Sequence, residues 1–237
     1  MSLLLQPSGV LREAARSTKR RAAARIEMGR AGRDPLVETL DILIFDDSMS
    51  LSGLNGNDPI GSRYTEARSA VKSIARASRS PLHQIAVIHF DYPSIEALPP
   101  TAINSRGGLG LVLEALTTPP DAIGTSILAP SMMAANNIAR RSDAEVLRCT
   151  IFSDFELMDQ QPLQPREELA KFPGQVHAVV MNAVPPQWLE VSRNATITRV
   201  GSDDPPGLLA ATLMHSLTAN RPGASAPRMV TKRVKSR

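Results

Sequence analysis

The chain has 237 residues, of which 42% are hydrophobic and 21% are charged. This composition is typical of a globular protein and excludes a collagen-like chain, a coiled-coil rod and a chain that is disordered throughout. A single cysteine, Cys149, excludes an internal disulfide framework and fits a reducing compartment. The sequence shows no apolar run of the roughly 20 residues that cross a bilayer and no signal-peptide pattern, so we expect a cytoplasmic protein.

The formal net charge of +4 is distributed unevenly along the chain. Residues 1–35 carry eight Lys or Arg against three acidic residues, and residues 221–237 carry six with no acidic residue, so residues 36–220 have a net charge of −7. We therefore predict a basic, partly helical extension over 1–35, one domain over 36–220 and a disordered basic tail over 221–237. The basic ends would serve solubility, weak binding to polyanions or dedicated contacts to nucleic acid.

Apolar runs and helical spacing alternate along the central segment. The segment 11–28 has good helix propensity but only a thin apolar stripe. After it we expect, in chain order, a strand at 40–45, a helix at 62–78, a strand at 85–90, a short edge strand at 95–98, helices at 107–116 and 126–140, a strand at 146–152, a helix at 166–171, strands at 175–181 and 195–200, and a helix at 206–217. This alternation predicts an α/β fold with an open, mostly parallel sheet and helices on both faces.

Oxygen-bearing side chains follow two of the predicted strands. Asp46 ends one strand and is followed at alternate positions by Ser48 and Ser50, while Asp154 ends another. Between them, Thr125 opens a predicted helix. Ligands of open α/β sheets bind at the carboxyl ends of the strands, where these residues are expected to converge. An all-oxygen set of this kind suits a hard cation such as Mg²⁺, Mn²⁺ or Ca²⁺ and does not suit zinc.

The order and spacing of these five residues resemble the metal-ion-dependent adhesion site of von Willebrand factor A (VWA) domains. The resemblance covers roughly residues 38–219 and implies a Rossmann-like fold. It implies that Ser48 and Ser50 ligate the ion directly and that Thr125 does so directly or through water. Asp46 and Asp154 would act mainly through bound water or a hydrogen bond, or close directly onto the metal.

The resemblance also implies a function that does not involve catalysis. One metal position would stay open for an Asp or Glu carboxylate of a protein partner, so that the ion bridges two proteins and no bond is broken. We therefore expect metal-dependent protein–protein interaction within a larger intracellular assembly, with an AAA+ ATPase as one partner class that the resemblance implies. The alternative is a nucleic-acid-associated scaffold that uses its basic termini.

Several positions depart from the family pattern. Leu51 stands where many members have Met. The family often has Gly-Gly-Thr, where this chain has Ile123 in place of the first glycine, and Phe155 replaces the glycine that often follows the last aspartate. None of these changes removes a ligand oxygen, but Phe155 is expected to stiffen or reshape its loop. Asp47, inside the motif, is predicted to be a solvated loop acid. A degenerate site that keeps the fold and binds no metal remains an alternative.

Enzymatic alternatives fit the sequence less well. A phosphotransferase of the haloacid-dehalogenase type needs a second aspartate two residues after Asp46, where this chain has Ser48. No phosphate-binding glycine loop of the required spacing is present. The four histidines are scattered and are expected to be core or surface residues, and Cys149 and Trp188 are expected to be packing residues.

Overall fold

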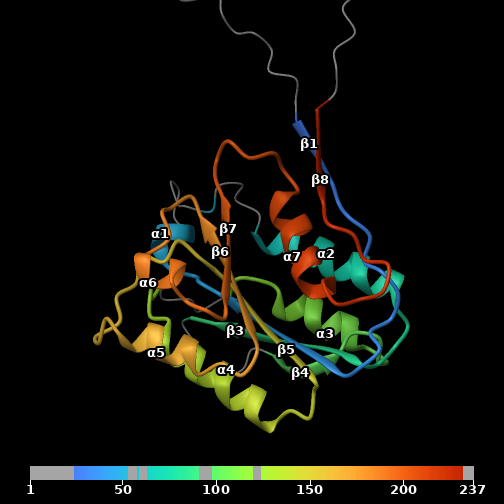
Figure 1. Cartoon of the computed structure of the whole chain (residues 1–237), viewed down its shortest axis with the longest axis horizontal. Coiled ribbons are helices and arrows are strands. Elements are labelled where there is room, and N and C mark those ends of the chain that lie inside the picture. The colour runs from blue at the N-terminus through green and yellow to red at the C-terminus, as the bar shows by residue number, and fades with distance from the viewer. Residues whose placement is uncertain (1–23, 53–57, 59–62, 91–97, 120–123, 232–237) are drawn as a thin grey trace, which may run out of the picture.

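A six-stranded sheet forms the centre of the molecule in a computed structural model that describes residues 24–52, 58, 63–90, 98–119 and 124–231 (Figure 1). The strand order is β4-β3-β2-β5-β6-β7, and every neighbouring pair is parallel except β3 and β4. The strands are β2 (Thr39–Phe45), β3 (His83–His89), β4 (Leu98–Ala102), β5 (Val146–Ser153), β6 (Gln175–Met181) and β7 (Ala195–Val200). The predicted α/β class with a mostly parallel sheet is confirmed.

The central strand β2 shows why the apolar runs were a reliable signal. It pairs over its whole length with β3 on one side and with β5 on the other, and all seven of its residues are buried. Side chains alternate between the two faces, so Leu43 and Phe45 enter one core and Ile42 and Ile44 enter the other. A strand that is buried on both faces needs apolar residues at nearly every position.

Helices cover both faces of the sheet, as predicted (Figure 1). One face carries α2 (Arg63–Ala77), α3 (Gly108–Ala115) and α7 (Leu208–Thr218), and the other carries α4 (Ala129–Arg141), α5 (Gln164–Ala170) and α6 (Gln187–Glu190). The short helix α1 (Met49–Ser52) directly follows the end of β2. None of the helices in the described part of the chain is long and apolar enough to span a membrane.

Several element boundaries differ from the predicted ones by one or two residues, and two differences have a structural reason or fall at the limit of the described residues. The edge strand β4 is Leu98–Ala102, and most of the predicted strand at 95–98 lies outside the described residues. Helix α4 begins at Ala129 and not at Ser126. Its first free backbone N–H groups are capped by the carboxylate of Asp159, at 3.1 Å from the nitrogen of Leu128 and 2.9 Å from that of Ala129. A cap supplied from so far along the chain leaves no local signal in the sequence.

The two ends of the described chain pair with each other. Strand β1 (Ala24–Glu27) and strand β8 (Arg228–Thr231) form an antiparallel ribbon that leads away from the body (Figure 1). The predicted helix over 11–28 is therefore wrong for its described end, and the predicted disordered tail is wrong for residues 221–231. Long-range pairing overrides the local helix propensity here. Residues 1–23 and 232–237 lie outside the described residues.

A buried charged cluster fixes the start of this C-terminal segment. We call it the amino-edge cluster; its members are Asp41, His83, Arg148 and Arg221. The guanidinium of Arg148 donates to both carboxylate oxygens of Asp41, at 2.6 and 3.0 Å. His83 lies between Asp41 and Arg221; because Arg221 can only donate, its partner nitrogen Nδ1 accepts, and Nε2–H donates to Asp41. Burial lowers the pKa of His83, which favours this neutral form.

Candidate metal centre at the carboxyl edge of the sheet

The candidate site lies where the strand order changes direction. From β2 the chain crosses to β3 on one side, whereas β5, β6 and β7 follow on the other side. The carboxyl ends of β2 and β5 therefore border a topological switch point, which is where open α/β sheets bind ligands. Asp46 directly follows β2 and Asp154 directly follows β5. We use the name carboxyl-edge site for the set Asp46, Ser48, Ser50, Thr125 and Asp154.

Asp46 is buried and held from three directions. Its backbone N–H donates to the carbonyl oxygen of Phe152 at 3.0 Å, which continues the β2–β5 pairing beyond the strand. Its Oδ1 accepts the backbone N–H of Ser48 at 2.9 Å, and its Oδ2 accepts the hydroxyl of Ser153 at 2.6 Å. The carboxylate therefore has one orientation, and the turn that carries Ser48 is tied to it.

The two serine hydroxyls lie side by side. Ser48 Oγ and Ser50 Oγ are 2.8 Å apart and hydrogen bonded to each other. Adjacent ligands of an octahedral Mg²⁺ at about 2.1 Å lie about 3 Å apart, so this spacing fits two neighbouring coordination positions. Ser48 is buried and Ser50 is half-buried, so the pair reaches from the interior to the surface.

Asp154 and Thr125 are brought to the same edge by their neighbours. Asp154 is buried, its Oδ1 accepts the backbone N–H of Glu156 at 3.0 Å, and its charge acts on Asp46. Gly124, directly before Thr125, packs so closely on Met49 that an added Cβ would lie 2.7 Å from Met49 Cγ. The loop of Thr125 is thereby placed against the residue that separates Ser48 from Ser50.

The electrostatics of the site favour a cation. Burial raises the pKa of Asp46 to about 6; the hydrogen bonds from Ser153 and Ser48 oppose this shift, and the charge of Asp154 adds to it. A buried carboxylate next to a second carboxylate is a group whose charge lacks compensation. A divalent ion would supply that compensation, and the hydroxyls and carboxylates present are the ligands that Mg²⁺ takes. The donor set therefore fits the predicted metal.

The prediction for Asp47 was wrong, because this residue is buried and not a solvated loop acid. Its carboxylate points away from the site to a set of partners on α2 and β3. Oδ1 accepts from Arg63 at 3.0 Å and from the hydroxyl of Tyr64, while Oδ2 lies 2.7 Å from His89 Nδ1. Asp46 and Asp47 thus face opposite sides of one loop, and the second carboxylate anchors the loop that carries the first.

Aromatic rings form a layer directly below this loop. The ring of Phe45 stacks between Tyr64, at a centroid distance of 4.8 Å, and Phe152, at 4.7 Å. The chain has only eight aromatic residues, so this gathering supports the carboxyl edge in particular. Sequence reasoning missed Arg63, Tyr64 and His89, whose relation to Asp47 depends on how α2 packs against the sheet.

The departure at Phe155 has a clear backbone consequence. Phe155 has a φ angle of 59°, in the left-handed region that glycine adopts without strain. Its side chain is nevertheless buried against the core and makes an edge contact with Trp188 at a centroid distance of 6.4 Å. The turn expected of a glycine is therefore kept by a residue that contributes packing, and Trp188 is confirmed as a packing residue.

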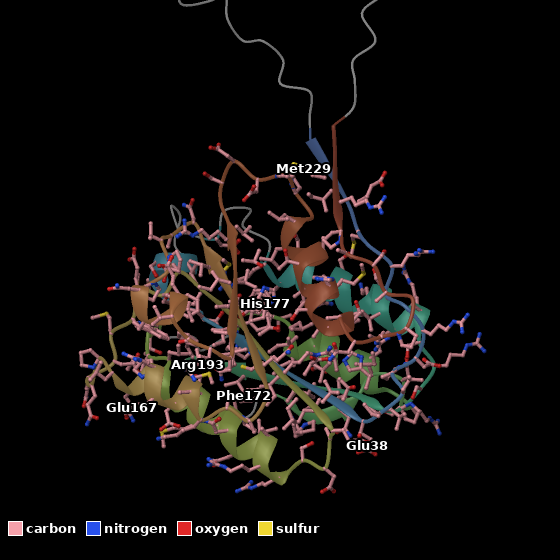
Figure 2. The ribbon with its side chains drawn as sticks, in the orientation of Figure 1. Glu38, Glu167, Phe172, His177, Arg193 and Met229 are labelled. Atoms are coloured by element: carbon pink, nitrogen blue, oxygen red, sulfur yellow. The ribbon has the colours of Figure 1, made fainter. Side chains whose placement is uncertain are left out.

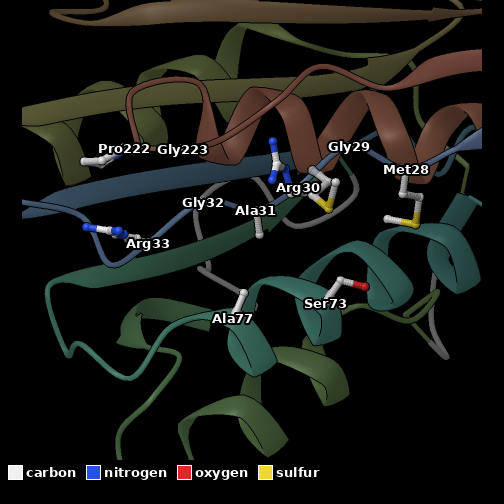
Figure 3. Close-up of a pocket in the computed structure, with 11 residues that line it drawn as sticks. Met28, Gly29, Arg30, Ala31, Gly32, Arg33, Ser73, Ala77, Pro222 and Gly223 are labelled. Atoms are coloured by element: carbon white, nitrogen blue, oxygen red, sulfur yellow. The ribbon is translucent and has the colours of Figure 1, made fainter.

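Other candidate groups lie elsewhere. Within the described ranges, no three His, Cys, Asp or Glu side chains are grouped to hold a metal ion; the carboxyl-edge site has only two such residues. A cavity of about 530 Å³ lies between residues 28–33, α2 and residues 222–223 (Figure 3). A second cavity of about 490 Å³ is lined by residues of α7 and by His177; Figure 2 shows the position of His177 on β6. Cys149 is buried in β5, as predicted, and burial raises its pKa.

Comparisons with known proteins identify the fold. No family model matches the chain, and no curated protein matches it. Solved structures do match. An aerotolerance-related membrane protein from Bacteroides fragilis matches with a TM-score of 0.55 and 13% identity, over 76% of this chain and 99% of that chain. The pilus adhesin SpaC from Lactobacillus rhamnosus GG matches with a TM-score of 0.59 and 10% identity, over 84% of this chain and 32% of that chain, and a von Willebrand factor type A protein from Catenulispora acidiphila matches with a TM-score of 0.54 and 12% identity, over 84% of this chain and 50% of that chain.

These matches define a class of fold. Together with the sheet order, they show that the chain has an α/β fold of the VWA type, as the sequence predicted. The chain spans nearly the whole of the first matched structure but only a third to a half of the other two. At such low identities the likeness concerns the fold, and the metal site, partner and cellular setting are matters for proposal.

Proposed function

We propose that the carboxyl-edge site binds a divalent cation, Mg²⁺ or else Mn²⁺ or Ca²⁺, and that the protein uses it to bind a protein partner without catalysis. The observation that carries this proposal is the buried Asp46 carboxylate, with its raised pKa, beside the Ser48–Ser50 hydroxyl pair at coordination spacing. The ion supplies a positive centre with room for an external carboxylate oxygen.

Each residue of the site has a separate task in this proposal. Ser48 and Ser50 offer their hydroxyl oxygens as direct ligands, while Asp46 orients the turn through the N–H of Ser48. The carboxylate of Asp154 balances the positive charge of the ion. Thr125 is half-buried, so its side chain can be reached by a partner from the surface. Because few carboxylates touch the ion directly, it keeps its affinity for a partner's carboxylate.

The partner and setting extend the proposal further. A role in protein–protein interaction agrees with the fold, which one matched structure shares as a pilus adhesin. We propose an intracellular assembly in which the partner presents an Asp or Glu; an AAA+ ATPase is the partner class that the resemblance implies. The acidic residue of the partner follows from the proposed metal site, whereas the partner class and the intracellular setting follow from the resemblance alone.

Titration calorimetry with Mg²⁺ tests the metal site directly. The Ser48→Ala variant removes one hydroxyl ligand and should weaken Mg²⁺ binding by tenfold or more, and Asp46→Ala should abolish it. The matched control is Ser73→Ala on α2, whose hydroxyl donates to the backbone oxygen of Ser69 in the same helix and has no other hydrogen bond among the described residues. Equal Mg²⁺ affinity in the wild type and in Ser48→Ala would overturn the proposal.

The β1–β8 ribbon favours a second candidate function, which is binding to nucleic acid. The pairing of these strands joins the two basic ends of the chain at one pole of the molecule. Residues 1–23 and 232–237 together hold nine Lys or Arg and one Glu in the sequence. Cationic segments that leave from one place contact the phosphates of one duplex more readily than segments that leave from opposite sides.

Salt dependence distinguishes this second function from the first. Binding to a DNA or RNA duplex through the ribbon should fall steeply with salt and should be lost when residues 1–23 and 232–237 are both deleted. Such binding should not need Mg²⁺ and should survive Ser48→Ala. Binding that is unaffected by the double deletion would exclude this use of the ribbon.

A further inference from the structure

Two large apolar side chains at the carboxyl edge have no core to enter. Met49, between Ser48 and Ser50, is 74% exposed, and Met158, four residues after Asp154, is 75% exposed. Single exposed apolar residues are common on protein surfaces and need no explanation. These two are notable because both contact the loop that carries Thr125.

The two methionines contact the Thr125 loop on either side of Thr125. Gly124 packs against the backbone nitrogen and side chain of Met49, with a φ of 80° that allows the close approach. On the other side of Thr125, the carbonyl oxygen of Ser126 accepts the backbone N–H of Met158 at 2.8 Å. The chain of contacts therefore runs from Met49 through residues 124–126 to Met158, with Thr125 in the middle.

We propose that Met49 and Met158 form an apolar clamp that selects a partner segment in which an acidic residue is flanked by large apolar side chains. This inference rests on the proposed function, because the acidic residue is the one that the ion receives. Methionine is suited to the task, since its flexible thioether adapts to side chains of different shapes. Protein interfaces combine apolar anchors with a central polar contact in the same way.

The charges of the site and of the domain explain why the partner segment should have one acidic residue with apolar neighbours. The site contains the carboxylates of Asp46 and Asp154, while Asp47 is already paired with Arg63. With a divalent ion bound, the centre accepts a negative oxygen, whereas the segment 36–220 as a whole has a net charge of −7 and repels further acidic groups. A partner rich in acids is therefore disfavoured, and a single acid with apolar neighbours is favoured.

A library of random displayed peptides, selected on the full chain in excess Mg²⁺ or in chelator, tests this inference. Peptides enriched only in Mg²⁺ should contain Asp or Glu next to Leu, Ile, Met or Phe. For one such peptide, Met49→Gln and Met158→Gln should each weaken binding by about tenfold, because glutamine keeps the length of methionine without its apolar end. Leu36→Gln is the matched control, since Leu36 is 79% exposed but precedes β2 at the opposite edge.

The outcomes separate the two proposals. If enriched peptides carry an acid but no apolar preference, or if both glutamine variants bind as the wild type does, the clamp is wrong and the metal function stands. If no peptide depends on Mg²⁺ and calorimetry shows no Mg²⁺ binding, the metal function fails and the clamp with it. Calorimetry of Met158→Gln, which lies outside the ligand turn, should show unchanged affinity for Mg²⁺ alone, and a loss of Mg²⁺ affinity in this variant would contradict the assignment of Met158 to a clamp outside the metal site.

Discussion

Asp46 should destabilise the protein when no metal is bound. Its pKa is raised from 3.8 to about 6 on folding, mainly by burial. Between these two values the unfolded chain gives up its proton before the folded protein does. The folded state then binds more protons, so this group makes the free energy of unfolding fall as pH rises from about 4 to 6, and its effect is constant at higher pH.

The size of this effect follows from the shift. A difference of about 2 pKa units corresponds to about 3 kcal/mol above pH 6. The Asp46→Asn substitution keeps the shape and removes the charge, so it should recover most of this free energy. The hydroxyl of Ser153 loses its carboxylate acceptor, which costs about 1 kcal/mol. We therefore expect Asp46→Asn to be about 2 kcal/mol more stable than the wild type at pH 8 in chelator.

Urea unfolding of both proteins between pH 4 and pH 8, with chelator, measures the difference. Taking the difference between the two proteins removes the contribution of His177, whose pKa is lowered to about 4 by burial and by His215. The gain should disappear toward pH 4. Saturating Mg²⁺ should then stabilise only the wild type, by about 2.7 kcal/mol at a hundred times the dissociation constant, and should cancel the advantage of the variant. A gain that does not depend on pH would refute the reasoning.

Three further substitutions test the geometry of the molecule. Gly124→Ala introduces a Cβ against Met49 at a left-handed backbone, and should lower thermal stability by about 1–3 kcal/mol and also weaken Mg²⁺ binding in calorimetry. Phe155→Gly relieves about 1 kcal/mol of backbone strain but removes a buried ring from Trp188, so urea unfolding should show a net loss of about 2–4 kcal/mol. Arg221→Met removes the hydrogen bond to His83 in the amino-edge cluster and should lower the free energy of unfolding by about 2 kcal/mol. Trypsin should then cleave the segment before β8 faster than in the wild type, and an unchanged cleavage rate would contradict the anchoring role of Arg221.

The sequence predicted the sheet well because the central strands are buried on both faces and therefore need a continuous run of apolar residues. Strands β2, β5 and β6 lie between neighbours and under helices, so their apolar runs mark them directly. The same argument located Asp46 and Asp154, since a residue that follows a buried parallel strand must lie at the carboxyl edge. The spacing Asp-x-Ser-x-Ser then placed the hydroxyls.

What escaped prediction depends on contacts between distant segments. Nothing near Asp47 in the sequence shows that Arg63, Tyr64 and His89 converge on it, because α2 and β3 bring those residues there. The ribbon of β1 and β8 joins Ala24 to Thr231, and its strands of four residues are too short to produce a pattern. Local propensity even favoured a helix for the first of them.

The two ends of the sheet handle buried charge in opposite ways, and this contrast is an argument for function at one of them. In the amino-edge cluster, Asp41 receives Arg148 and His83, and these partners outweigh burial and hold its pKa below the usual value. At the carboxyl edge the donors to Asp46 within the described part of the chain are neutral, the pKa of Asp46 is raised, and Phe155 nearby holds a strained backbone angle. A fold that compensates a carboxylate fully at one end can do so at the other, where Arg63 is instead turned to Asp47. The uncompensated charge of Asp46 therefore supports the proposal that this site binds a metal ion.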